Sequence, residues 1–266
     1  MEENTLKPIN SFVAMFDFLA FKALRKELGT EGIHQLYIHS ILQLIQHAIA
    51  LKGKKIQRNE QNVSIPDFGY QSLNYRIVSD SIILFADGSS FDHFLKIIAA
   101  SHKLLCSGFV GHKATLRGAI GYGDLIYDAN SIWVGSAIED AYVGESSQVW
   151  SGCSLTSACE KFVLENEYIS KYKNWCDVAL VQESDSRKGE NIKKAKKRIV
   201  EYNIPEQSNP KTGVKYSERM GYVLDWTLNV YEGAGVKAFS ETTSNHAKKI
   251  IENTRLFEVW ARKNNR

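Results

Sequence analysis

The sequence is poor in several features that would assign it to a specialised class of protein. It has only four cysteines and four prolines in 266 residues. The cysteines, Cys106, Cys153, Cys159 and Cys176, form no Cys-x-x-Cys pair, which argues against a zinc finger or a disulfide framework. The formal net charge is only +3, so composition alone indicates neither nucleic acid nor an anionic surface as a partner.

Long apolar runs and a secretory start are also missing. No apolar segment approaches the roughly 20 residues needed to cross a bilayer, and the N-terminal stretch MEENTLKPIN has no basic region followed by an apolar core. We therefore expect a cytoplasmic protein without a membrane partner. The 44% of hydrophobic and 24% of charged residues are typical of a globular protein.

Two aspartates interrupt apolar segments. Asp17 lies in the strand-like run SFVAMFDFLAFK, and Asp80 lies in NYRIVSDSIILFAD, which is typical of a tight hairpin turning near Ser79 and Asp80. Neither has a basic neighbour in sequence, and an unpaired buried carboxylate is costly. A hard divalent cation, which binds one or two carboxylates together with phosphate oxygens, would remove that cost. The simpler interpretations stay open: Asp17 as a helix N-cap and Asp80 as a turn residue.

The other segments predict a mixture of helices and strands. Apolar residues recur at helical spacing over four segments, 21–28, 33–51, 91–109 and 242–263. Residues 115–128 predict a glycine-punctuated strand, and Gly135 precedes a helix whose inward side chains would be Ala137, Ile138, Ala141 and Tyr142.

Less regular segments are also assigned. Residues 52–62 predict a solvated loop, 178–184 an edge strand and 221–229 a buried strand. Residues 186–203 predict a basic helix, which we expect to be solvated rather than bound to nucleic acid, because no aromatic residues for stacking are interleaved with its lysines.

The motif Phe-Asp-Phe-Leu-Ala-Phe at 16–21, a long helical region, and Ile-Val-Ser-Asp-Ser-Ile-Ile-Leu at 77–84 together resemble the catalytic core of class III nucleotide cyclases. The resemblance covers roughly residues 10–160. It implies an α+β fold with a ferredoxin-like βαββαβ core and helices on a mainly antiparallel sheet. It also implies two Mg²⁺ or Mn²⁺ ions, held by Asp17, the carbonyl of Phe18 and Asp80. We expect a cyclase-like domain over 1–185 and a C-terminal extension over 186–266 packed on the same core.

A narrower group is more similar still. Conventional class III cyclases carry an Asn and an Arg on the equivalent helix. Aligned on Gly135, the two positions hold Glu139 and Val143 in this sequence. The pattern Gly-x-Ala-Ile-Glu-x-Ala-Tyr-x-x-Glu at 135–145 instead resembles the pyrimidine cyclases of the bacterial Pycsar anti-phage system. That resemblance implies conversion of UTP or CTP to the 3′,5′-cyclic monophosphate and pyrophosphate. It further implies a homodimer with composite active sites and a separate effector that senses the cyclic nucleotide.

Further site residues follow from the same comparison. Arg117, in Leu-Arg-Gly-Ala-Ile, is a candidate for binding the triphosphate or for a structural ion pair. Arg76 stands where adenylate cyclases read the base, and its donors suit the carbonyls of uracil better than the amino group of adenine; a plain surface role for it stays open. We expect Glu139 to contact substrate. We expect the backbone N–H groups of Phe18, Leu19, Ala20 and Phe21, at a helix start, to bind phosphate.

Two other functions stay open. One is a non-catalytic sensor with a cyclase-like fold, suggested by Glu139 and Val143. The other is a relative of the GGDEF-type enzymes, which would require a Gly-Gly-Asp/Glu-Glu-Phe hairpin where this sequence has Val78-Ser79-Asp80-Ser81.

Overall fold

The structure is a computed structural model. It describes residues 7–19, 21–49, 53–58, 61–66, 73–111, 115–128, 133–174, 198–207, 216–230 and 245–264. Within these ranges, no helix is both long enough and apolar enough to span a membrane.

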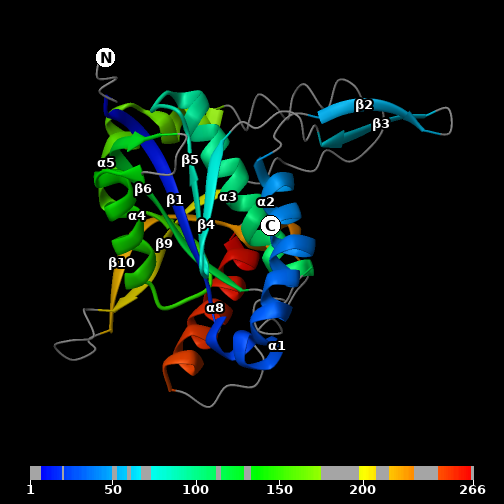
Figure 1. Ribbon diagram of the computed structural model, residues 1–266. Helices are drawn as coiled ribbons and strands as arrows, with labels where there is room; N and C mark the ends of the chain where they lie inside the picture. Colours follow the sequence, from blue (N-terminus) through cyan, green and yellow to red (C-terminus); the bar gives the residue numbers. More distant parts are fainter. Residues whose placement is uncertain are drawn as a thin grey trace, which may run out of the picture.

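One large sheet forms the centre of the molecule (Figure 1). Its strands follow the order β4-β5-β1-β6-β8-β10-β9, with β7 added to β6. Their bounds are β1 Ile9–Phe18, β4 Asn74–Val78, β5 Ser81–Phe85, β6 Leu116–Tyr127, β7 Trp133–Val134, β8 Cys153–Leu155, β9 Ile199–Gln207 and β10 Tyr216–Leu224. Only the β6–β8 pair is parallel among the described strands. The order β4-β5-β1-β6 with intervening helices is the predicted ferredoxin-like βαββαβ core, so the predicted α+β fold is confirmed.

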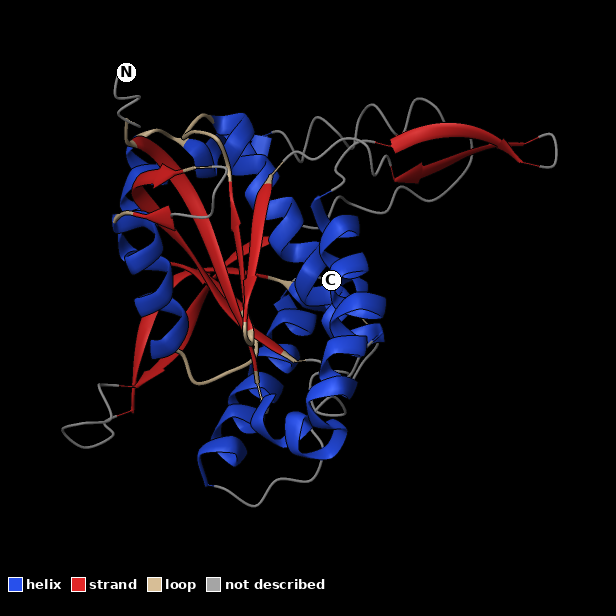
Figure 2. Ribbon diagram, in the orientation of Figure 1, coloured by secondary structure: helices blue, strands red, loops and turns tan. Residues whose placement is uncertain are grey.

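Helices lie on both sides of the sheet (Figure 2). Their bounds are α1 Phe21–Leu36, the π-helical turn η1 Tyr37–Ile41, α2 Leu42–Ile49, α3 Phe91–Gly111, α4 Ser136–Ser147, α5 Ser157–Glu165, the 3-10 helix η2 Trp226–Asn229 and α8 Asn245–Asn264. Residues 168–174 are also helical. The helices predicted over 33–51, 91–109, 242–263 and after Gly135 are thereby confirmed to within a few residues.

The alternation of side chains along β1 divides the core into two parts. Phe12, Ala14 and Phe16 face the larger cluster, which α2, α3 and α8 cover. Val13 faces the opposite side, where Ala137 and Ala141 of α4 cover the sheet. Asp17 follows Val13 by four residues, so it lies on the α4 side.

Close contact between α4 and β6 depends on small residues. A Cβ added at Gly121 would lie 2.6 Å from the backbone nitrogen of Ala141 and 2.8 Å from the carbonyl oxygen of Ala137. Gly135, at the N-cap of α4, has a φ of 152°, a conformation that favours glycine. These glycines therefore set how near α4 lies to the strand that carries Arg117.

The fold corrects several local predictions. Residues 53–58 and 61–66 pair as a separate β2–β3 hairpin rather than forming a loop, in keeping with the strand preference of Ile56, Val63 and Ile65. Tyr142 was expected to face inward, but it is 56% exposed.

The C-terminal region is corrected as well. Residues 199–203, expected in a basic helix, belong to β9, because pairing with β10 lets Ile199 and Ile204 enter the core. The predicted strand 221–229 ends at Leu224. The next residue, Asp225, accepts a hydrogen bond from the N–H of Thr227 and is the N-cap of the 3-10 helix η2. The predicted edge strand over 178–184 and the basic segment 186–197 lie outside the described residues.

Candidate functional site

The sheet brings Asp17 and Asp80 together. In the register of β1, Asp17 pairs with Ser81 on one side and Arg117 on the other. The N–H of Phe18 donates to the carbonyl oxygen of Asp80 at 3.2 Å, and the two aspartate side chains are within hydrogen-bonding reach of each other. Asp17 is a strand residue four positions before α1, so it is not the N-cap of that helix. Asp80 does lie in the hairpin turn.

Burial and like charges disfavour ionisation of Asp17. Burial is the largest cause, followed by the charges of Glu145 and Asp80, and together they raise the pKa of the Asp17 carboxyl to about 7, against the opposing effect of Arg117. The side chain of Asp17 is still 25% exposed. A divalent cation bound here would lower the pKa of Asp17 and favour the ionised form of both carboxyls. Asp17 and Asp80 therefore fit the predicted ion. No group of three His, Cys, Asp or Glu residues suited to a metal occurs in the described ranges. An ion here would therefore need substrate oxygens to complete its ligands.

Arg117 is the cation of this site. Its Nε donates to Oε1 of Glu145 at 2.6 Å, and its Nη1 donates to the carbonyl oxygen of Gln148 at 3.0 Å. Its Nη2 lies 3.8 Å from Oδ2 of Asp17. Arg117 therefore makes an ion pair and faces the carboxylate site at the same time. Glu145 is only 3% exposed, and burial raises the pKa of its carboxyl while Arg117 lowers it.

The turn that carries Asp80 is held by Tyr37. The hydroxyl of Tyr37 donates to the carbonyl oxygen of Ser79 at 2.5 Å, and Ser79 has a φ of 56°, a strained conformation that its surroundings have to maintain. The Tyr37 ring packs edge-on against Phe18. Burial, then the charges of Asp80 and Asp17, raise the pKa of Tyr37 to about 12. Tyr37 thus stays a neutral hydrogen-bond donor beside the two aspartates.

Arg76 lies on the same side of the sheet as Asp17. Arg76 pairs with Ile83, which pairs with Met15, two residues before Asp17. From strand spacing, its Cα is about 12 Å from that of Asp17. The guanidinium carbon lies 5.2 Å from the centre of the Trp133 ring. Arg76 Nε and Trp133 Nε1 are both buried without a hydrogen-bond partner in the described part of the chain. Two adjacent donors therefore lack an acceptor.

The backbone amides behave differently from the prediction. Those of Phe18 and Leu19 already donate to the carbonyl oxygens of Asp80 and Thr115, at 3.2 and 3.0 Å, which corrects the expectation that they bind phosphate. A strand end, unlike a helix start, uses its amides in sheet pairing. Ala20 lies outside the described residues, and Phe21 is the first residue of α1.

The outer face of α4 carries Glu139, which is exposed, and Val143, which is 63% exposed. Neither points into the core, and the structure brings neither into contact with Asp17 by any interaction among the described residues. α4 therefore supplies no cation to this site within one chain at the position where conventional cyclases carry Arg.

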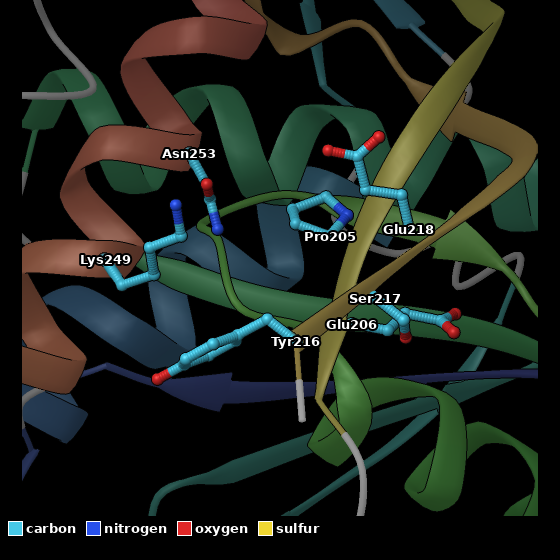
Figure 3. Close-up of a pocket in the computed structure, with 7 residues that line it drawn as sticks. All are labelled: Pro205, Glu206, Tyr216, Ser217, Glu218, Lys249 and Asn253. Carbon is cyan, nitrogen blue, oxygen red and sulfur yellow. The ribbon is translucent and has the colours of Figure 1, made fainter. Parts of the chain in front are cut away.

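A separate pocket of 160 Å³ lies between β9, β10 and α8 (Figure 3). Three of its polar side chains are already engaged: Glu206 pairs with Arg219, Lys249 with Glu252, and Asn253 donates to the carbonyl oxygen of Val149. None of its lining residues is an expected site residue. The carboxylate site is therefore the better candidate for chemistry.

No protein-family model matches the chain, and no curated protein matches it. Among solved structures, it is similar to the guanylyl cyclase domain of the RhoGC fusion protein from the aquatic fungus Blastocladiella emersonii. That match has 13% identity and a TM-score of 0.44, and it covers 60% of this chain and 88% of the other.

Two further matches are to a rhodopsin-guanylyl cyclase catalytic core solved with ATPαS (11% identity, TM-score 0.48, coverage 82% and 96%) and to the guanylyl cyclase Cya2 (12%, 0.43, 85% and 98%). All of these TM-scores lie below 0.5, so the chemistry of this chain has to be inferred from its own residues.

Three residues of the site were not predicted as site residues. Glu145 was part of a recognised motif, but its pairing with Arg117 depends on how α4 packs on β6. Trp133 lies two positions before Gly135, and an aromatic residue close to the start of the predicted helix was the available signal. Tyr37 was one apolar position of a helical pattern, and nothing in the sequence linked it to Ser79.

Proposed function

We propose that this protein is a metal-dependent pyrimidine nucleotide cyclase. The observation that carries the proposal is the meeting of Asp17, near the end of β1, and Asp80, in the β4–β5 turn, with Nη2 of Arg117 3.8 Å from Oδ2 of Asp17. Two half-buried, mutually repelling carboxylates are costly for a fold to maintain, and such pairs are typical of sites that bind divalent cations and phosphate.

In this proposal Asp17, Asp80 and the carbonyl oxygen of Phe18 hold two Mg²⁺ or Mn²⁺ ions. When bound, these ions lower the pKa of the ribose 3′-hydroxyl and neutralise the triphosphate. The 3′-oxygen forms a bond to the α-phosphorus, the bond to the oxygen bridging the α- and β-phosphates breaks, pyrophosphate leaves, and the 3′-hydroxyl proton passes to water. Arg117 offers its guanidinium to the charged phosphates, so the protein contributes by positioning and charge rather than by a nucleophile.

The choice of a pyrimidine rests on Arg76 and Trp133. Both present donors without acceptors, and neither offers an acceptor to the amino group of adenine. Uracil presents two carbonyls, so UTP is favoured over CTP. The separation of about 12 Å between Arg76 and Asp17 allows one nucleotide to lie with its base at the first residue and its phosphates at the second.

The assembly and the biological role are part of the same proposal. Glu139 on the exposed face of α4 is available to a second copy of the chain, which suits a homodimer with composite sites. The cyclic nucleotide would act as a signal in anti-phage defence, sensed by a separate effector.

A non-catalytic nucleotide sensor is the second candidate. The exposed Val143 in place of an arginine and the engagement of Arg117 by Glu145 favour it. Such a protein would bind a nucleoside triphosphate without turnover.

The test is incubation with each of the four nucleoside triphosphates and Mn²⁺, followed by mass spectrometry of the products. We expect cyclic UMP as the main product, with pyrophosphate, and its loss in Asp17→Ala and Asp80→Ala. Binding without product would support the sensor. Cyclic AMP or GMP as the main product would contradict the proposed base specificity.

A further inference from the structure

Glu145 is a buried carboxylate that has one charged partner among the described ion pairs, Arg117. It lies on the inner side of α4, near the end of the helix. Together with the carbonyl oxygen of Gln148, directly after α4, it fixes two of the three guanidinium nitrogens of Arg117. A guanidinium bound at two points has little freedom to rotate.

The third nitrogen, Nη2, is the one that faces Asp17. Its distance of 3.8 Å from Oδ2 of Asp17 is an ion-pair distance, but it is too long for a hydrogen bond. Nη2 is thus held near the carboxylate site without being saturated by it. A guanidinium that served stability alone would gain most by closing this distance.

We propose that Glu145 is a positioning residue that acts through Arg117. It holds the guanidinium so that Nη2 is presented, within the same chain, to the phosphates of a substrate bound at Asp17 and Asp80. This inference rests on the proposed cyclase function and deepens it, since it identifies which group replaces the arginine missing at Val143.

The proposal explains why α4 can carry Val143 on its outer face, where conventional cyclases carry an arginine. The cation is on β6 instead, and α4 contributes the anion that orients it. The two elements are in tight contact through Gly121 and Ala141. Loss of a group that orients an active-site residue typically costs about 10- to 100-fold in activity.

The experiment compares Glu145→Gln with Glu160→Gln, a matched control. Glu160 also pairs with an arginine, Arg219, at 2.8 Å, but it lies on α5. Steady-state release of pyrophosphate from UTP with Mn²⁺ gives kcat and KM, and thermal unfolding gives Tm. We expect Glu145→Gln to lower kcat about 10- to 100-fold with little change in KM, and Glu160→Gln to lower Tm with kcat nearly unchanged.

A double-mutant comparison separates positioning from stability. If Glu145 acts through Arg117, then adding Glu145→Gln to Arg117→Ala should cause almost no further loss of kcat. Arg117→Lys is the second variant, used in case Glu145→Gln does not fold. It keeps the charge but lacks the fork of nitrogens, and we expect a similar loss of kcat.

The outcomes are distinct. Equal effects of Glu145→Gln and Glu160→Gln on kcat, additive losses in the double variant, or full activity of Arg117→Lys would overturn the role of Glu145 while leaving the cyclase proposal intact. A wild-type protein that releases no pyrophosphate from any nucleoside triphosphate would overturn both.

Discussion

At the scale of the residue, the site is defined by an imbalance of charge. Three carboxylates, those of Asp17, Asp80 and Glu145, repel one another, and the guanidinium of Arg117 attracts those of Asp17 and Glu145. Burial and the charges of Glu145 and Asp80 raise the pKa of Asp17 to about 7. Ionisation of Asp17 in the folded protein therefore lowers the free energy of unfolding.

This has a measurable effect on stability. The pKa of Asp17 rises from 3.8 to about 7 on folding, so the folded state binds the proton more tightly and wild-type stability falls as pH rises across that window. Without divalent ions, Asp17→Asn should therefore raise Tm at pH 8 and raise it much less at pH 5, as measured by circular dichroism. Asp92→Asn is the control, since Asp92 is 69% exposed and pairs only with Lys96 among the described ion pairs. An equal gain at both pH values would contradict the interpretation.

A second residue-scale prediction concerns the base. Trp133→Phe removes the indole N–H but keeps a ring beneath Arg76. If the N–H binds a uracil carbonyl, its loss should lower kcat/KM for UTP about 10-fold, because a hydrogen bond from a buried donor contributes roughly 1 kcal/mol or more. The ratio of cyclic UMP to cyclic CMP formed from an equal mixture checks this. Trp260→Phe, on α8, serves as the control, and an unchanged ratio in Trp133→Phe would exclude the role.

At the scale of the element, the hairpin β4–β5 depends on a helix for its shape. The π-helical turn η1 begins at Tyr37, whose hydroxyl holds the carbonyl of Ser79 in the strained turn. π-helical turns occur frequently at functional sites. At its other end, the hairpin is held by Asn74 and Tyr127, which both donate to Asp87.

The two ends of the hairpin should respond differently. Tyr37→Phe and Tyr127→Phe each remove one hydroxyl and should cost about 0.5–1.5 kcal/mol of unfolding free energy. Only Tyr37→Phe is expected to lower cyclase activity strongly, because it alone loosens the turn that carries Asp80. Urea unfolding and pyrophosphate release give the two readouts. Equal loss of activity in both variants would argue against a specific role for η1.

The contact between α4 and β6 is also an element-scale feature. Gly121→Ala would drive a Cβ into the backbone of α4, and we expect a cost of about 1–3 kcal/mol together with lower activity, since Glu145 moves with the helix. Gly144→Ala is the milder control, because its new Cβ would first meet the methyl group of Thr156 at 2.6 Å. Chemical unfolding gives the loss of unfolding free energy in each variant. A larger loss in Gly144→Ala would contradict the idea that the contact of α4 with Gly121 is the tighter one.

At the scale of the whole molecule, the exposed face of α4 is the surface available to a second chain. Tyr142 and Val143 are more than half exposed on it, and Val78 of the edge strand β4 is exposed on the same side of the sheet. Exposed apolar side chains grouped in this way are typical of protein interfaces. A composite site would then combine Asp17 of one chain with Glu139 of the other.

Complementation tests the composite site. Asp17→Asn and Glu139→Ala should each be nearly inactive, whereas the two variants co-expressed should recover about a quarter of wild-type activity, since half of the dimers are mixed and one of their two sites is intact. Total activity of the co-expressed mixture is the measurement, and mixed dimers isolated through two different tags should show about half of wild-type activity. No recovery in confirmed mixed dimers would mean that each site is built within one chain.

The sequence by itself determined the two aspartates, the β4–β5 hairpin, the strands β1 and β6, and the helices α1 to α4 between and after them. An acidic residue inside an apolar run and the periods of apolar residues are local signals that do not depend on distant contacts. Only the tertiary structure decided the partners. Glu145 meets Arg117 across 28 positions, and Tyr37 meets Ser79 across 42, through packing that no local pattern encodes. Residues 199–203 likewise became a strand because β10 offered pairing, which outweighed their helical surroundings in sequence.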